Sequence, residues 1–93
     1  MGKAENFVEG YLVDKAESLG FLCYKFMSGH NGVPDRILIG NGKVFFVETK
    51  SRNGKLSEMQ KVVHRKFLRR GIKVFVPNTR EQVDEIIEEL MRG

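Results

Sequence analysis

Three residues with metal-binding and acid–base chemistry stand at the ends of two short apolar segments. Asp35 precedes the apolar run 37–39, while Glu48 and Lys50 follow a second run at residues 43–47. Hard divalent cations such as Mg²⁺ prefer carboxylate oxygens, and a neighbouring ammonium group can orient or deprotonate a water held by such an ion. These residue types predict a metal-assisted hydrolytic site if the two runs lie side by side.

The segment between the two runs predicts a β-hairpin that brings these residues together. Residues 40–42 read Gly-Asn-Gly, and Asn-Gly accepts the positive φ values that a tight hairpin turn needs. Such a hairpin places the start of its first strand beside the end of its second, so Asp35 should lie near Glu48. Because side chains alternate along a strand, Glu48 and Lys50 should point to the same face.

Three longer motifs follow one another along the chain and carry a family resemblance. They are Gly-Val-Pro-Asp-Arg at 32–36, Glu-Thr-Lys at 48–50 and Gly-Lys-Leu-Ser-x-x-Gln at 54–60. Their order and spacing resemble the VRR-NUC branch of the PD-(D/E)XK nuclease superfamily, over about residues 4–90. Short PD…ExK strings recur by chance, so the ordered set of motifs carries the likeness. Thr49 departs mildly from the branch, which often has an apolar residue there.

The resemblance implies a fold and a chemistry. The fold is of the α/β class, with a restriction-endonuclease-like αβββαβα core in which helices flank a mixed sheet. One or two Mg²⁺ or Mn²⁺ ions would be bound by Asp35, Glu48 and the backbone carbonyl of Thr49, while Lys50 aligns the attacking water. The expected reaction is endonucleolytic hydrolysis of DNA, with branched substrates such as Holliday junctions, because stand-alone VRR-NUC domains look like the archaeal junction resolvases.

Two further site residues are expected from the same resemblance. Glu9, on the first expected helix, would assist in metal or water positioning, with Glu5 on the same helical face as its competitor. Gln60 would reach the active site from a second helix. Gln60 also stands three residues after Ser57, where a capping box alone explains its type.

The charge distribution favours an anionic partner. The net charge is +4, and nine lysines or arginines but a single acid lie between residues 50 and 73. A basic block beside paired carboxylates suits an enzyme that holds phosphates near its metal. The alternative is a solvated face of an amphipathic helix. The candidate DNA-binding residues are Lys25, Arg52, Lys55, Lys61, Arg65, Lys66 and Arg69. Lys25 could equally be an exposed residue on an alternating strand, with no contact to DNA.

Size and composition predict one small domain over residues 1–93. No apolar stretch approaches the roughly 20 residues of a membrane span, and the N-terminal residues lack a signal-peptide core. A single cysteine, Cys23, fits a reducing compartment, so we expect a cytoplasmic, intracellular protein. Cys23 and the two histidines, His30 and His64, lack the spacing of a zinc site.

The periodicity of apolar residues predicts the elements that position the site. Helices are expected at about 3–19, from a cap at Ser57 to Gly71, and from a cap at Thr79 onward. Strands are expected at 21–27, on both sides of the hairpin, and at 72–76, with the last one parallel to its neighbour. The apolar face expected for the second helix consists of Met59, Val62, Val63, Phe67 and Leu68.

We also expect a homodimer, because two opposed cuts in a four-way junction need two active sites related by a two-fold axis. The aromatic load is large for so small a core, and some rings could remain exposed at an interface. These residues are Phe21, Tyr24, Phe26, Phe45, Phe46, Phe67 and Phe75. The alternative function is a non-catalytic DNA-binding module or a subunit of a larger nuclease assembly.

Overall fold

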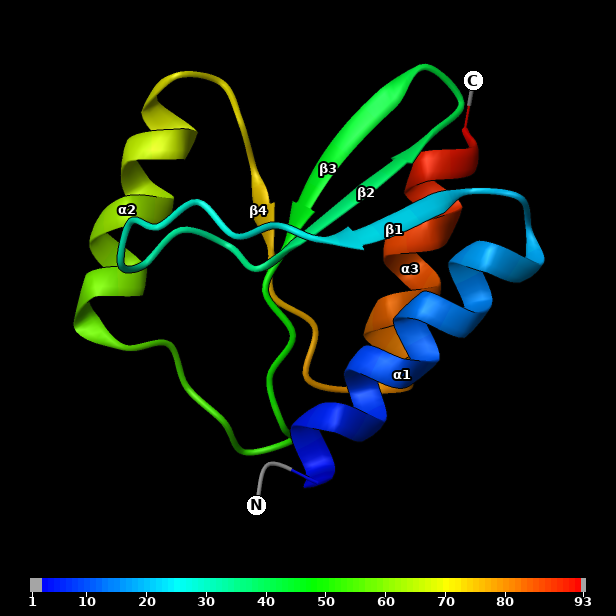
Figure 1. The fold of residues 1–93 in the computed structure, drawn as a ribbon, viewed down its shortest axis with the longest axis horizontal. Coiled ribbons are helices and arrows are strands. Elements are labelled where there is room, and N and C mark those ends of the chain that lie inside the picture. Colours follow the sequence, from blue (N-terminus) through cyan, green and yellow to red (C-terminus); the bar gives the residue numbers. More distant parts are fainter. Residues whose placement is uncertain (1–2, 93) are drawn as a thin grey trace.

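The computed structural model describes residues 3–92, and their side chains from residue 7 onward. A four-stranded sheet lies between two helical layers, with α1 and α3 together on one side and α2 on the other (Figure 1). The αβββαβα order expected from the sequence is confirmed. The elements are α1 (Lys3–Ser18), β1 (Leu22–Lys25), β2 (Arg36–Gly40), β3 (Lys43–Val47), α2 (Glu58–Arg69), β4 (Val74–Phe75) and α3 (Arg80–Met91).

The hairpin between β2 and β3 fixes the register of the sheet. The sheet order is β1-β2-β3-β4, with both β1–β2 and β2–β3 antiparallel. Asn41 has φ 52° and Gly42 has φ 75°, so both central residues of the turn have positive φ, as a type I′ turn requires. Gly40 pairs with Lys43, and Arg36 at the other end pairs with Val47. The hairpin prediction is therefore confirmed in both its turn and its strands.

Strand β4 pairs with β3 in parallel, as expected, but it is shorter than the predicted strand 72–76. The N–H of Ile72 donates to the Phe67 carbonyl at 3.0 Å, so this residue completes the end of α2 instead of joining the sheet. Beyond the strands, the pairing continues through the N–H groups of Glu48 and Lys50, which donate to the carbonyls of Phe75 and Pro77.

One face of the sheet is closed by α1 and α3. Apolar side chains of α1, α3 and the sheet are buried there, including Val83, Ile86, Ile87 and Leu90 of α3. Removing this apolar surface from water supplies most of the driving force for folding. The core residues are Val8, Leu12, Ala16, Cys23, Leu38, Val47, Phe75, Val83, Ile86, Ile87 and Leu90.

The opposite face is covered only in part. The ring of Phe46 meets Phe67 of α2 at a centroid distance of 5.4 Å and Phe26 at 5.6 Å. The expectation that α2 buries a full apolar stripe is wrong, since Val63 is its buried residue and Leu68 is 62% exposed. The reason is that α2 packs mainly beside β4, at one edge of the sheet.

Both predicted helix caps form, with one difference. Ser57 and Gln60 make a reciprocal capping box at the start of α2. Thr79 accepts from the N–H of Gln82 at α3, but the Gln82 side chain accepts from Asn78 instead of from the capping residue itself. Within residues 3–92, no helix combines the length and the apolar character needed to cross a membrane.

Candidate active site

Asp35 and Glu48 face each other across the sheet at one end of the hairpin. Arg36 and Val47 are the last registered pair of β2 and β3, so the next pair outward is Asp35 and Glu48. Both residues are held by their outer neighbours in the sheet, since the Asp35 carbonyl accepts from the Phe26 N–H at 2.8 Å and the Glu48 N–H donates to the Phe75 carbonyl at 2.8 Å. Directly opposed residues have Cβ atoms about 5 Å apart and share a face of the sheet. The register therefore brings the two predicted acids together.

Burial distinguishes these acids from ordinary strand-end carboxylates. Glu48 is only 4% exposed, and Asp35 is half-buried. Burying a carboxylate is costly unless cations or hydrogen-bond donors compensate for the lost hydration. Such a position is unusual for a glutamate that only ends a strand, and it is typical of an acid that has a specific task.

Lys50 lies on the same side of the chain as Glu48. Its N–H donates to the Pro77 carbonyl at 3.0 Å, which keeps residues 48–50 extended beside the segment after β4. Alternation then directs Glu48 and Lys50 to the α2 side and Thr49 to the α1–α3 side. Thr49 is fully buried, in agreement with the predicted orientation of its side chain away from the acids.

Glu9 is engaged in a different set of contacts. Its Oε2 accepts from the Arg36 Nε at 2.8 Å and lies 3.7 Å from the Nζ of Lys25. Arg36 follows Asp35 on β2, so alternation directs these two side chains to opposite faces of the sheet. Among the described side chains, no group of three or more acids, histidines or cysteines could hold a metal ion. Glu9 is therefore not gathered with Asp35 and Glu48, and its assisting role stays a prediction, as does that of Glu5, whose side chain lies outside the described ones.

Helix α2 carries two polar residues one turn apart, Gln60 and His64, both half-buried. The Gln60 side chain accepts from the Ser57 N–H at 2.9 Å, so its capping role is confirmed and its catalytic role stays a prediction. His64 lies one turn further along. Burial lowers its pKa, and the charge of Lys50 lowers this pKa further. The sequence analysis considered His64 only as a zinc ligand, although its four-residue spacing from Gln60 places both on one face of α2.

The loop before Asp35 is held against α2 by a close approach of its backbone. Gly32 has φ 91°, and a Cβ at this position would lie 2.7 Å from the Met59 carbonyl and 2.8 Å from a Val63 methyl. Only glycine fits there, since both the positive φ and the lack of space exclude a side chain. Gly32 of the Gly-Val-Pro-Asp-Arg motif thus connects the position of Asp35 to that of α2.

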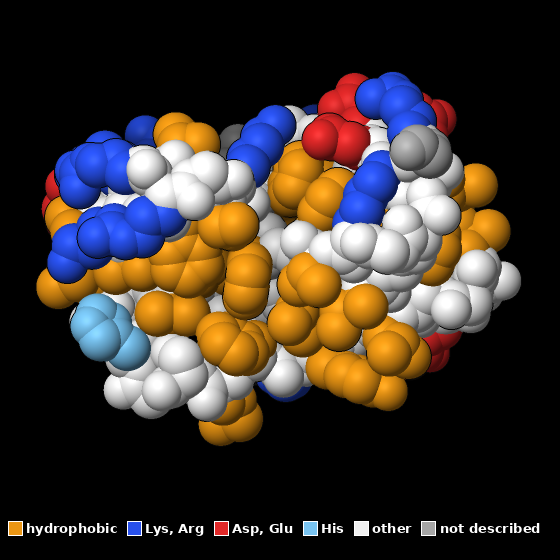
Figure 2. Space-filling model, turned by 90° about the horizontal axis from the view of Figure 1, so that it is seen from above, with side chains coloured by type: hydrophobic (Ala, Val, Ile, Leu, Met, Phe, Trp, Pro, Cys, Tyr) orange, Lys and Arg blue, Asp and Glu red, His pale blue; other side chains and the backbone are white. Residues whose placement is uncertain are grey.

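The predicted DNA-binding residues lie on α2, on the connection before it and on β1. Cationic side chains gather over α2, beside a band of apolar surface (Figure 2). On α2 the exposed cations are Lys61, Arg65, Lys66 and Arg69, of which Lys61 also pairs with Glu58 at 3.3 Å. Arg52, Lys55 and Lys25 are exposed on the connection before α2 and on β1. Their contacts with DNA stay predictions.

Comparison with known proteins agrees with this geometry. The family model of the VRR-NUC domain matches residues 7–81. The chain is 35% identical over 79 residues to the "Putative nuclease p44" of Acyrthosiphon pisum secondary endosymbiont phage 1, covering 83% of this chain and 85% of that protein. A solved structure described as a VRR-NUC domain superposes with a TM-score of 0.81 at 36% identity, covering 91% of this chain and 95% of the other. The motifs, the sheet register and these similarities together show that the chain belongs to the VRR-NUC domain family.

Proposed function

We propose that this protein is a divalent-metal-dependent endonuclease that hydrolyses phosphodiester bonds in DNA. The observation that carries the proposal is the β2–β3 register, which pairs Arg36 with Val47 and so sets Asp35 opposite Glu48 one position beyond, with Lys50 two residues later. Membership of the VRR-NUC family and the phage relative named as a nuclease support the same chemistry.

The donor set at this end of the sheet fits Mg²⁺ or Mn²⁺. Mg²⁺ is usually bound through one or two carboxylates, with waters and substrate phosphates completing its shell. Asp35 and Glu48 would supply two carboxylates from adjacent strands, and the Thr49 carbonyl could add a backbone oxygen. When bound, such an ion lowers the pKa of a water molecule and stabilises charge on the phosphate.

The residues of the chain then have separate tasks. Asp35 and Glu48 would hold the ion from neighbouring segments of the sheet, where the hydrogen-bonded backbone limits their movement. Lys50 orients the attacking water with its ammonium group and adds positive charge beside the phosphate. The exposed cations of α2 bind the flanking phosphates through charge-assisted contacts. The leaving 3′-oxygen departs on the side opposite the attacking water, because the displacement is in line.

We extend this proposal to branched DNA as the substrate and to a homodimer as the active assembly. On the α2 side of the sheet, three side chains away from the acids are not covered: Leu22 is 45%, Val44 52% and Tyr24 56% exposed. The register aligns them in rows with Ile39 and Ile37, which makes a continuous apolar face. We call these five residues the open sheet face. A second copy packed there would be related by a two-fold axis and would supply a second active site for opposed cuts.

The test is cleavage of a panel of labelled DNA structures with and without Mg²⁺ or Mn²⁺. We expect cleavage to depend on the ion and to fall about a thousandfold or more in Asp35→Asn, Glu48→Gln and Lys50→Ala, since each removes several kcal/mol of transition-state stabilisation. DNA binding should survive. Glu17→Gln, at an exposed position of α1, is the matched control. Full activity of Asp35→Asn would contradict the proposal, whereas metal-dependent cleavage of flaps but not four-way junctions would contradict only the junction preference.

A further inference from the structure

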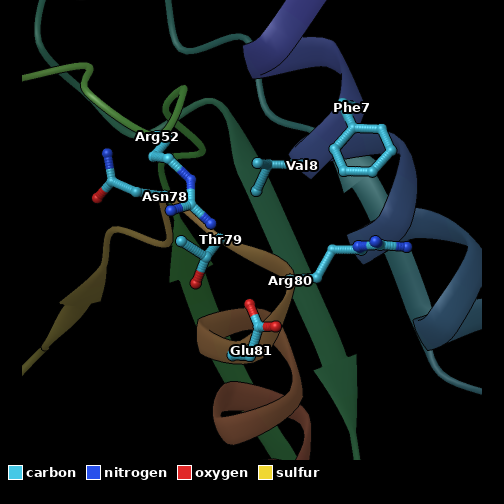
Figure 3. Close-up of a pocket in the computed structure, with 7 residues that line it drawn as sticks. All are labelled: Phe7, Val8, Arg52, Asn78, Thr79, Arg80 and Glu81. Carbon is cyan, nitrogen blue, oxygen red and sulfur yellow. The ribbon is translucent and has the colours of Figure 1, made fainter.

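A pocket of about 280 Å³ opens where α1, the start of α3 and the connection between β3 and α2 meet (Figure 3). Its walls come from segments that also carry the candidate active site. Val8 precedes Glu9 on α1, and Arg52 follows Lys50 by two residues on the connection. The pocket is therefore close to the acids along the chain, but it plays no part in the chemistry described above.

One wall of this pocket is an exposed aromatic ring with a stacked cation. Phe7 is 56% exposed, and the guanidinium of Arg80 lies 4.8 Å from the centre of its ring. In Figure 3 the Arg80 side chain runs beneath the Phe7 ring at the edge of the pocket. An exposed aromatic ring and a guanidinium plane are the two side-chain surfaces on which nucleobases stack, and this stacking accepts any base.

The other wall carries Arg52, on a turn that is held in place. Asn78 donates through its Nδ2 to the Ser51 carbonyl at 2.6 Å and to the Gly54 carbonyl at 3.0 Å. The Gly54 N–H also donates to Ser51 at 2.9 Å. These bonds order the turn before any ligand binds. Arg52 extends from it toward the pocket (Figure 3), where its planar donors suit a phosphate.

A carboxylate in the same pocket makes the charge balance testable. Glu81, at the start of α3, lines the pocket and points toward it (Figure 3). Its negative charge opposes a phosphate, whereas Arg52 and Arg80 attract one. The site thus has two cations and one anion. This small excess of positive charge favours the binding of one nucleotide with a single phosphate over the binding of several consecutive phosphates of a DNA strand.

We propose that this pocket binds one unpaired nucleotide of the substrate DNA, with its base against Phe7 and Arg80 and its phosphate on Arg52. A base inside a duplex already stacks on its neighbours, so a side-chain platform can receive only an unpaired one. The inference rests on the proposed nuclease function and deepens it. It selects substrates that contain an unpaired nucleotide, as at a branch point.

The experiment uses Asp35→Asn protein, so that the DNA stays intact, and a flap substrate with 2-aminopurine at its first unpaired position. Binding should quench the 2-aminopurine fluorescence when residue 7 is the native Phe7 or is changed by Phe7→Trp. Binding should leave the fluorescence unquenched in Phe7→Leu. Phe7→Ala should bind the flap about tenfold more weakly and bind a plain duplex unchanged. Circular dichroism checks the fold, which Phe7→Leu should preserve because the position is exposed.

Charge variants provide an independent test with opposite signs. Arg52→Gln should weaken flap binding and lower its salt slope by roughly 0.7 units, the value for one contact with a single strand. Glu81→Gln should strengthen flap binding. Arg70→Gln, at an exposed position of similar chemistry beyond α2, should leave the preference for flap over duplex unchanged.

The outcomes separate the two proposals. Equal flap affinities of Phe7→Ala and the native protein, with metal-dependent cleavage intact, would overturn the nucleotide pocket and leave the nuclease proposal standing. If Asp35→Asn cleaves DNA as well as the native protein, the proposed active site is wrong and the nuclease proposal fails instead. The two results can be told apart because the fluorescence reports binding and not cleavage.

Discussion

The two faces of the sheet differ in how they are covered, and the difference separates stability from chemistry. On the α1–α3 side, Leu38 and Val47 are fully buried beneath two helices. On the α2 side, the neighbouring positions Ile37 and Phe46 are only half-buried, and the acid pair stands at the end of this face. Residues one position apart on the same strand therefore have different tasks, since alternation sends them to opposite faces.

This small fold concentrates its core on one side of the sheet and leaves the other side partly exposed. A domain of this size buries a modest core. Here that core is completed by α1 and α3 without help from α2. The α2 side can then keep polar and exposed apolar groups at little cost in stability. The predictions below test this division, beginning with the largest expected effect.

The largest effect is expected from a cavity on the closed face. Leu38→Ala should lower the free energy of unfolding by about 2–5 kcal/mol, because Leu38 is fully buried and its truncation leaves a cavity in the core. Urea denaturation followed by circular dichroism measures it. Ile37→Ala, on the adjacent position of the other face, is the matched control and should cost clearly less. Equal losses for the two variants would show that the faces are equivalent in stability.

The next effect concerns the open sheet face. Tyr24→Glu should weaken a dimer by roughly thirtyfold or more, since a charged group replaces an interface aromatic worth about 2 kcal/mol. Light scattering at micromolar concentration reports the mass, and paired nicking of a four-way junction reports its use. Leu19→Glu makes the same kind of change at an exposed residue outside this face and should leave the mass unaltered. A native protein that is monomeric would contradict the assembly directly.

A smaller effect is expected at the cationic surface of α2. Replacing Arg65, Lys66 and Arg69 together with alanine should reduce the salt slope of duplex binding by up to about 0.9 units per lost phosphate contact. The measurement is a titration of labelled DNA at several salt concentrations. Arg92→Ala, which follows the acidic helix α3, serves as the control. An unchanged slope in the triple variant would identify this surface as solvated only.

The smallest effect is a pH dependence carried by His64. Burial, and then the charge of Lys50, lowers the His64 pKa from 6.5. The folded protein therefore favours the neutral ring, and the unfolded chain takes up a proton first. The contribution of neutral His64 to the free energy of unfolding is complete above pH 6.5. It is lost progressively as the pH falls below this value toward the lower pKa of the folded protein.

Thermal unfolding at several pH values between neutral and acidic conditions tests this assignment. The melting temperature of His64→Gln should fall less than that of the native protein as the pH is lowered. His30→Gln, at an exposed histidine, should follow the native curve. Identical curves for His64→Gln and the native protein would show that His64 does not sense its surroundings on the α2 side.

The sequence alone determined the local geometry on which the site depends. Asn41 and Gly42 specify a tight turn because both tolerate positive φ, and this turn sets the register that pairs Arg36 with Val47 and leaves Asp35 and Glu48 one position beyond. Ser57 with Gln60 likewise specifies the start of α2. These predictions succeeded because each depends on residues close together in the chain, where steric limits and hydrogen bonding leave few alternatives.

Tertiary structure decided the features that depend on distant segments. Glu9 pairs with Arg36, 27 positions away, and no local pattern indicates which cation a helical acid will meet. Leu68 is exposed because α2 packs at the edge of the sheet, although helical periodicity alone makes it an interior residue. The pocket between Phe7 and Arg52 likewise exists only when α1 and the connection before α2 meet. Periodicity states which side chains are apolar, while the packing of whole elements decides which of them leave water.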